Sequence, residues 1–308
     1  MMGEVSIVLA TYNGASYIEE QLESIINNTY TDWTIEICDD GSTDRTMEIV
    51  SEYQERYPDK INIHRNEHQL GVTLNFLEGA KRAKGNYVMF CDQDDVWLPE
   101  KIEKTLNFIK EKEQAAGKNK PIAVFTDAKL VDGVLRCIHK SFFKYSSLDA
   151  NKVDLPHLLM ENKMIGCTSM FNRALADKIT TVPKSARYHD WWIAIIASVF
   201  GEIHYLDEVT MLYRQHGGNA VGGKNFLHYA VECVKDIKWQ KEALLLTQKQ
   251  AWEFHEIYKS VILEEQGQIL RDFASLHSAN WFEKRDRLFR YGFWKSGKIR
   301  NIGVLLLV

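Results

Sequence analysis

The sequence predicts an α/β protein in which a mostly parallel central sheet is flanked by helices. Two observations support this class. Short apolar runs rich in β-branched residues recur through residues 1–130, and a stretch with helical spacing of its apolar side chains follows each of the first four. After residue 226 only the helical pattern continues, so we expect a helical C-terminal extension.

Five strands alternate with helices in this first part. The first strand is predicted from VSIVLA at 5–10, an unbroken apolar run typical of a buried strand. Pro99 suits the first turn of the helix that follows the fourth strand. The other strands are predicted at 34–40, 61–66, 86–92 and 121–127, and the other helices at 16–26, 47–53 and 72–84.

The alternation loosens after residue 131. Residues 132–165 form a polar stretch, and an apolar helix is expected at 189–201. A strand at 165–171, a short helix at 173–180 and a strand at 203–216 complete this part. Glycines make 217–224 a loop, and we place the domain boundary there. The predicted domains are 1–222, with halves at about 1–130 and 131–222, and 223–308.

Composition excludes several classes of protein. The 308 residues are 45% apolar and 26% charged, which is ordinary for a folded globular chain, and the net charge of −4 disfavours a nucleic-acid binder. The five cysteines form no CxxC pair and are expected to be reduced. The start lacks the features of a signal peptide, and no apolar run reaches the roughly 18 residues that span a bilayer. We therefore expect a cytoplasmic protein.

Polar side chains gather where three of the predicted strands end, the edge at which open α/β sheets bind ligands. The clusters are Thr11-Tyr12-Asn13-Gly14 after the first strand, DDGSTD (39–44) after the second and DQDD (92–95) after the fourth. Each one alone is equally well explained as a turn with a helix cap. Three carboxylates within four residues repel one another, however, and a bound cation relieves that repulsion.

The positions of these acids separate several kinds of phosphate site. A dinucleotide fold needs GxGxxG after the first strand, and only Gly14 is present there. A Walker A loop is also absent, and an aspartyl phosphatase carries its acids after the first strand rather than the fourth. A nucleotide diphosphate held through Mg²⁺ or Mn²⁺ fits better.

The same segments resemble the family-2 glycosyltransferases, which have the GT-A fold. The resemblance lies in VSIVLATYNGASYIEEQLESI, DDGSTDRT and GVTLNFLEGAKRAKGNYVMFCDQDDVWLPEKI. HDWW and YRQHGGNAVG are similar to segments of bacterial polysaccharide rhamnosyltransferases. The match spans about residues 4–220 in the expected order. It implies a nucleotide-sugar half at 1–130, an acceptor half at 131–222, and a nucleotide-diphospho-sugar donor.

The resemblance also implies roles for the residues at the strand ends. Tyr12 would contact the base, with Thr11 and Asn13 shaping the turn. Asp40 would contact the base or ribose, while Asp39 would be structural. Asn75 would lie near the same pocket, and the alternative is that it is an exposed helix residue. Of the signature acids, Asp94 and Asp95 would hold the ribose and the metal. Asp92 would support them.

Inverting sugar transfer needs a base to take the proton of the acceptor hydroxyl. The family's base maps onto Asp190, and the alternative role for this residue is a helix cap. His189 is the second candidate, because neutral imidazole also accepts a proton. Trp97 and Trp191 offer flat faces to an acceptor sugar, although such residues are more often core.

Arg214 and His216 precede the glycine loop. They would grip the diphosphate or complete the metal shell, and for Arg214 the alternative is a surface salt bridge. The loop itself would close over the donor and exclude water.

The C-terminal segment 281–300 interleaves aromatic side chains with seven basic and two acidic ones. This composition is typical of an amphipathic segment on an anionic membrane surface, and we favour that interpretation for 281–308. The alternatives are a helix that packs on the catalytic domain with a solvated basic face, and a homodimer interface.

Together these features predict an inverting glycosyltransferase that depends on Mg²⁺ or Mn²⁺. Our best hypothesis is transfer of L-rhamnose from dTDP-rhamnose to a lipid-linked or growing surface-polysaccharide acceptor at the inner face of the cell membrane. A UDP-hexose donor is the first alternative. A non-catalytic module that binds a nucleotide sugar or glycan is the second.

Overall fold

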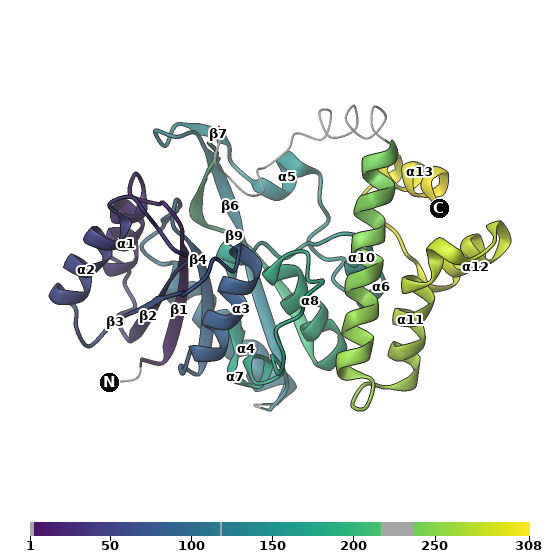
Figure 1. Ribbon diagram of the computed structural model, residues 1–308, viewed down its shortest axis with the longest axis horizontal. Helices are drawn as coiled ribbons and strands as arrows, with labels where there is room; N and C mark the ends of the chain where they lie inside the picture. The colour runs from purple at the N-terminus through teal and green to yellow at the C-terminus, as the bar shows by residue number, and fades with distance from the viewer. Residues whose placement is uncertain (1–2, 118, 217–236) are drawn as a thin grey trace.

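The computed structural model describes residues 3–117, 119–216 and 237–308 (Figure 1). The predicted glycine loop, and with it the proposed domain boundary, lies outside these residues. The elements are β1 (Val5–Thr11), α1 (Ile18–Ile26), β2 (Trp33–Asp39), α2 (Thr46–Arg56), β3 (Ile61–Arg65), α3 (Val72–Arg82), β4 (Tyr87–Asp92), β5 (Val96–Trp97), α4 (Lys101–Ala116), β6 (Ile122–Val131), β7 (Cys137–His139), α5 (Phe142–Ser146), α6 (Leu155–Met160), η1 (Gly166–Thr168), β8 (Ser169–Asn172), α7 (Arg173–Ala176), α8 (His189–Phe200), β9 (Glu202–Arg214), α10 (Ile237–Tyr258), α11 (Glu264–Ala274), η2 (Leu276–Ser278), α12 (Trp281–Tyr291) and α13 (Lys298–Leu307).

One sheet of nine described strands forms the centre of the molecule, in the order β3-β2-β1-β4-β8-β6-β9-β5, with β7 paired to β6. The first four strands in this order are parallel, and Val8 lies opposite Glu36 on one side and Phe90 on the other. The predicted α/β class with flanking helices is confirmed. The second half is mixed, because β8 runs antiparallel between β4 and β6, and β5 runs antiparallel to β9.

Side chains of the central strands alternate between two buried layers, as the period of a strand requires. Ile7 and Leu9 point toward the layer that contains α1, α2 and α4, whereas Val8 and Phe90 point toward α3 and α8. All of these strand residues are fully buried. Because both faces are covered, the strands read as continuous apolar runs, which is why their positions are predictable from the sequence.

The departures from the prediction lie mainly after residue 92. The stretch 132–165 contains β7, α5 and α6, whose short lengths give little periodic signal. The predicted strand at 165–171 begins only at Ser169, since a 3₁₀ turn occupies the preceding residues. The helix expected at 173–180 ends at Ala176. The helix after Pro99 starts at Lys101, two residues later than expected, and the Pro99 carbonyl accepts a 2.8 Å hydrogen bond from the amide of Thr29.

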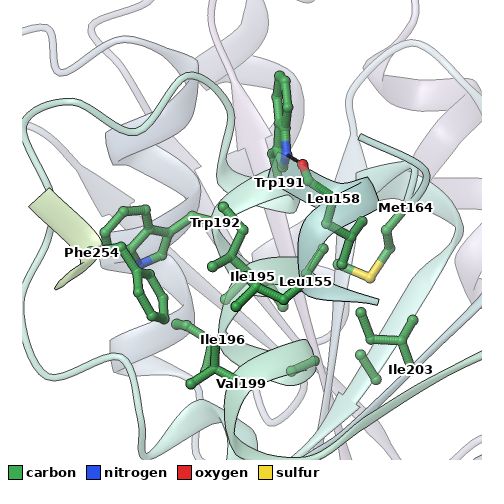
Figure 2. Packing of buried hydrophobic residues seen from close by; sticks show 14 of the residues in the cluster. Leu155, Leu158, Met164, Trp191, Trp192, Ile195, Ile196, Val199, Ile203 and Phe254 are labelled. Carbon is green, nitrogen blue, oxygen red and sulfur yellow. Dashed lines mark hydrogen bonds between the residues drawn. The ribbon is translucent and has the colours of Figure 1, made fainter. Parts of the chain in front are cut away.

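The helical extension packs against the rest of the molecule rather than standing apart. Phe254 on α10 lies edge-on to Trp192 on α8, with 5.2 Å between the ring centroids (Figure 2). The hydrophobic cluster continues from there to Phe273 on α11, Leu288 on α12 and Val304 on α13. Figure 1 shows these helices gathered at the end of the molecule opposite α1 and α2. Within the described ranges, no helix has both the length and the apolar character needed to cross a bilayer.

Candidate active site

The carboxyl ends of β1, β2 and β4 meet at one edge of the sheet, because these strands are parallel and in register. A cavity of about 440 Å³ opens there, between the strand ends on one side and the 162–166 segment with the start of α8 on the other. Eight of the residues predicted for the site line it: Thr11, Tyr12, Asp40, Asn75, Asp92, Asp94, His189 and Asp190.

Gln93, which was not predicted, holds the end of β1. Its side-chain oxygen accepts hydrogen bonds from the Thr11 hydroxyl at 2.6 Å and the Tyr12 amide at 2.9 Å. Its amide nitrogen donates to the Tyr12 carbonyl at 3.1 Å. This clamp leaves the Tyr12 ring 45% exposed over the cavity, so the ring is accessible to a planar ligand.

Asp40 is buried against the loop that leads into α3. Its carboxylate accepts hydrogen bonds from the amides of Leu70 and Gly71 at 2.7 and 2.8 Å, and from the side chain of Asn66 at 2.9 Å. Asn75 is also buried and donates to the Cys38 carbonyl at 2.8 Å. It is therefore not the exposed helix residue of the alternative interpretation, and it lies beside Asp40 in the cavity wall.

Asn13 lies in the turn after β1, where the resemblance implies that it shapes the turn of the donor site. Its backbone is left-handed, with φ of 49°, and its side-chain oxygen accepts a 2.8 Å hydrogen bond from the amide of Thr43. Its own amide donates to the Ser42 hydroxyl at 2.9 Å. Asn13 thus joins the first two strand-end loops, and it is not among the residues that line the cavity.

The three acids of DQDD divide into two groups. Asp95 is fully buried, and ligand atoms of Asp92, Asp95 and Cys167 lie within 4.8 Å of one another, a group that does not include Asp94. Burial and the neighbouring carboxylates raise the pKa of Asp92 to about 7 and raise that of Asp95 as well. Asp94 instead lies with His216: its Oδ2 is 2.8 Å from the imidazole Nε2.

This division places the predicted metal ligands in two separate groups. The structure brings Asp94 and His216 together, but Asp95 lies inside the sheet, where its Oδ1 accepts a hydrogen bond from the backbone amide of Arg214 at 3.0 Å. An oxygen and an imidazole nitrogen at this separation fit a divalent cation such as Mn²⁺, which accepts both kinds of donor. The Asp94–His216 pair is thus one place that could hold a metal, and the group of Asp92, Asp95 and Cys167 is another.

Arg214 was expected to grip a diphosphate, and its surroundings argue against that role. The side chain is only 3% exposed. Its guanidinium donates to the carbonyls of Asp94 and Gly133, each at 2.7 Å, and forms an ion pair with Glu20. Arg214 therefore connects β9 to α1 and to the DQDD loop, and it does not line the cavity.

Asp190 lies in the first turn of α8 and faces the cavity. Its carboxylate accepts hydrogen bonds from the Gly166 amide at 3.0 Å and from the Trp191 amide at 2.6 Å. Burial raises its pKa to about 7, although these amides and the Asn162 side chain oppose the shift. The carboxylate thus binds a free amide in the first turn of α8, whose cap residue is Tyr188, and it also lines the cavity.

His189 is packed between aromatic rings. Its imidazole stacks on Phe76, with 3.9 Å between centroids, and meets Phe90 edge-on at 4.8 Å. Burial lowers its pKa to about 3, so the ring is neutral at physiological pH. A neutral group with so low a pKa is a weak proton acceptor, which makes His189 a poorer base than Asp190.

Two of the predicted acceptor contacts are core residues instead. Trp97, on β5, is 2% exposed and packs within the layer of α1 and α4. Trp191 is 5% exposed, and its indole nitrogen donates to the Leu158 carbonyl at 2.6 Å (Figure 2). Neither lines the cavity, because burial of a large aromatic surface outweighs any use of it for a ligand.

Several cavity residues carried no signal in the sequence. Asn162 and Lys163 come from the polar stretch whose fold was not predicted, Gly166 lies in a 3₁₀ turn where a strand was expected, and Tyr188 directly precedes α8. Gln93 was detectable in principle, since it lies inside the DQDD motif. The others reach the cavity only through tertiary packing.

The fold and the site together define a glycosyltransferase of the GT-A class. The model of Glycosyl transferase family 2 matches residues 6–129. The chain is 32% identical over 222 residues to the dTDP-rhamnosyl transferase RfbG of Shigella flexneri, a match that covers 70% of this chain and 73% of that protein. The chain belongs to glycosyl transferase family 2.

A further relative and two solved structures are also similar to this chain, the structures in fold. The putative teichuronic acid biosynthesis glycosyltransferase TuaG of Bacillus subtilis is 35% identical over 108 residues, covering 35% of this chain and 42% of TuaG. The crystal structure of S. aureus TarS 1–349 with UDP has a TM-score of 0.57 at 19% identity, covering 93% and 72% of the two chains. The mannosyltransferase PcManGT of Pyrobaculum calidifontis, in complex with GDP-Man and Mn²⁺, also has a TM-score of 0.57, at 18% identity and coverages of 99% and 79%.

Proposed function

We propose that this glycosyltransferase transfers a sugar with inversion and that Asp190 is the base. One observation carries the proposal: a single cavity is lined by Tyr12, Asp40 and Asn75 at one side, by Asp94 next to it, and by Asp190. The first three suit a nucleoside, Asp94 suits a metal-bound diphosphate, and Asp190 supplies a carboxylate for the acceptor hydroxyl. In this reaction the acceptor oxygen attacks the anomeric carbon, the carboxylate takes its proton, and the nucleoside diphosphate leaves.

Asp94 and His216 would hold the divalent cation, Mg²⁺ or Mn²⁺. A cation bound there supplies positive charge to the leaving diphosphate. The Mn²⁺ in the complex of PcManGT supports this choice. The residues of this chain do the rest: Gln93 fixes the Tyr12 loop, the 66–71 loop fixes Asp40, and Gly166 orients the carboxylate of Asp190.

The donor we favour is dTDP-rhamnose. This donor is supported by the 32% identity over 222 residues to RfbG, a dTDP-rhamnosyl transferase. A UDP-hexose donor is the alternative, supported by the UDP-GlcNAc complex of TarS. A non-catalytic binding module is a weaker candidate, because binding alone needs no carboxylate with a raised pKa at the cavity wall.

A nucleotide panel distinguishes these donors. Thermal denaturation is measured with dTDP, UDP, GDP and ADP, each with Mn²⁺ and with EDTA, because a ligand at 100 times its Kd stabilises by about 2.7 kcal/mol. A metal-dependent shift with dTDP alone supports the rhamnosyl donor, and a shift with UDP supports the hexose donor. Transfer from the matching nucleotide sugar to a glycan acceptor then separates an enzyme from a binding module.

We further propose that the acceptor is lipid-linked and that 281–308 rests on the inner face of the cell membrane. Two helical stripes of exposed apolar side chains support this. Phe282 and Phe289 on α12 are 78% and 65% exposed, and Ile299, Ile302 and Leu306 on α13 are 59%, 58% and 82% exposed. Six of the seven basic residues in 281–300, all except the buried Arg300, are at least partly exposed and would complement anionic lipid. In this proposal, 1–222 is the catalytic domain and 223–308 the membrane-contacting one.

A further inference from the structure

A buried ionic cluster connects the C-terminal helix to the segment that orients Asp190. Arg300, on α13, is 9% exposed as a residue, and its guanidinium donates to the carboxylate of Glu161 at 3.1 Å. The same carboxylate forms an ion pair with Lys163, whose side chain is fully buried. It also accepts a 2.9 Å hydrogen bond from the amide of Ser296. The C-terminal region therefore supplies two of the four members of this cluster.

Ser296 adds hydrogen bonds within the cluster. The Ser296 hydroxyl lies 2.6 Å from Lys163 Nζ, and the same oxygen accepts from the Asp149 amide at 3.0 Å. Burial raises the pKa of Glu161, but the charges of Lys163 and Arg300 and the Ser296 amide hold it below its ordinary value. The carboxylate thus remains ionised, and loss of either cation would remove one of the two charges that pair with this buried carboxylate, which is destabilising locally.

Asn162 lies between Glu161 and Lys163 in the sequence, so the cluster holds the backbone on both sides of it. The Asn162 side chain makes a 3.1 Å hydrogen bond with the amide of Met164 and a 3.0 Å bond with its carbonyl, which shapes the turn toward Gly166. The Gly166 amide donates to the carboxylate of Asp190 at 3.0 Å, and the Asn162 side chain, which lines the same cavity, acts to lower the pKa of that carboxyl. A hydrogen bond to Asp190 and a neighbouring polar side chain therefore both come from the segment that the cluster anchors.

Arg300 fixes a second wall of the cavity through backbone carbonyls. Its guanidinium donates to the carbonyls of Ser146 at 2.6 Å and Ser147 at 3.2 Å, at the end of α5. Phe142 at the start of α5 and Leu148 just beyond it both line the cavity. One arginine from the C-terminal helix thus contacts both the α5 wall and the 161–166 wall.

We propose that Arg300, with Ser296, is a positioning residue for transfer: it holds Glu161 and Lys163 so that Asn162 and Gly166 present Asp190 in its productive orientation. This inference rests on the proposed role of Asp190 as the base. It assigns the C-terminal helix a part in the active site that is separate from any contact with a membrane. Displacement of a reacting group by about 1 Å can cost about 100-fold in rate, so the effect should be large.

The test compares Arg300→Met and Arg300→Lys with Arg173→Met as a matched control. Arg173 also donates to backbone carbonyls, those of Ala83 and Gly85, but it lies at the start of α7 and contacts no part of the cavity wall. Arg300→Met should lower kcat about 10- to 100-fold with the donor KM changed less than threefold. Arg300→Lys should recover part of the rate, and Arg173→Met should leave kcat near the wild-type value.

Hydrogen–deuterium exchange of the peptide 161–168 gives a readout that does not need turnover. Arg300→Met should speed exchange there, whereas Arg173→Met should not. Ser296→Ala, which keeps every charge, should have a smaller effect in the same direction and serves if Arg300→Met does not fold. Unchanged exchange at 161–168, or equal losses of kcat in Arg300→Met and Arg173→Met, would overturn the inference. Failure of the base assignment is recognised separately, by an Asp190→Asn variant that retains transfer.

Discussion

Asp94 and His216 are 122 residues apart in the sequence, yet Asp94 Oδ2 lies 2.8 Å from His216 Nε2. The His216 ring also stacks on Tyr17, with 4.8 Å between centroids, so its position is defined by α1 as well as by β9. A carboxylate and an imidazole held this close at a nucleotide-sized cavity are suited to share one divalent cation.

We therefore expect His216→Ala and Asp94→Asn each to abolish the metal-dependent part of nucleotide binding. Isothermal titration of the nucleoside diphosphate, with Mn²⁺ and with EDTA, measures this directly. In the wild type the two titrations should differ by at least tenfold in Kd, and in either variant they should coincide. His204→Ala, at a histidine that pairs with Glu202 away from the cavity, is the control and should behave as the wild type. A variant that keeps the full metal effect would remove its residue from the metal site.

Asp190→Asn should lower kcat by about 10²- to 10⁴-fold, the usual contribution of a general base. Asparagine keeps the size of the side chain and can still accept the hydrogen bond from Gly166, so the donor Kd should change little. Steady-state rates and donor titration on the same preparation test both halves of this expectation. His189→Asn is the comparison: a greater loss of kcat there than at Asp190 would reverse the assignment of the base.

The raised pKa of Asp190 predicts how activity depends on pH. Only the carboxylate accepts a proton, so with a pKa of about 7 the value of kcat should rise with pH and reach a plateau above it. At one pH unit below that pKa the rate should be about a tenth of the plateau. A profile that is flat between pH 5.5 and 8.5 would show that Asp190 does not titrate in the rate-limiting step.

Stability should change with pH in the opposite sense. The folded state favours the protonated form of Asp190, so this contribution is fully present below the unfolded pKa of about 4 and is lost as the pH rises through about 7. Thermal denaturation of the metal-free wild type should therefore show a Tm that falls between pH 5 and 7.5. Asp190→Asn should reduce this slope.

Substitution of Trp97 should lower the stability of the protein, whereas substitution of Tyr12 should weaken donor binding. Trp97 is buried, and Trp97→Ala should lower the free energy of unfolding by about 3–5 kcal/mol, as for other large aromatics in cores. Tyr12 is 45% exposed, so Tyr12→Ala should leave stability within about 0.5 kcal/mol and weaken donor binding instead. Denaturant unfolding and donor titration of both variants provide the comparison. Weaker acceptor binding by a stable Trp97→Leu variant would restore Trp97 to the site.

The sequence predicted best those parts of the fold and site that depend on local pattern. The runs around Val8 and Phe90 are buried on both faces, so their strands and the polar residues at the strand ends could be located directly. β5 is two residues long, and the antiparallel position of β8 depends on packing with no local signature. Trp97 and Arg214 were assigned to the site from their residue types. Both are buried in the structure, and sequence alone does not reveal that burial.

The division within DQDD could not be predicted for a related reason. Asp94 and Asp95 lie in the turn between β4 and β5, and the local sequence does not show which way that turn directs each carboxylate. Which of the two faces the cavity depends on β9, which supplies both His216 beyond its end and the Arg214 amide that binds Asp95. The Arg300 cluster is a further case, since its members come from segments about 140 residues apart.

Replacement of exposed apolar residues on α12 and α13 should weaken binding to anionic vesicles. Phe282 and Leu306 are 78% and 82% exposed, and transfer of each to the lipid interface should contribute about 1.5–3 kcal/mol. Phe282→Glu with Leu306→Glu should therefore reduce binding at least tenfold in co-sedimentation with vesicles of mixed phosphatidylglycerol and phosphatidylcholine. Val134→Glu, at an exposed valine before β7, is the control and should bind as the wild type does. If the double variant instead keeps vesicle binding and converts a dimer to a monomer in sedimentation velocity, the surface is an interface between two copies of the chain.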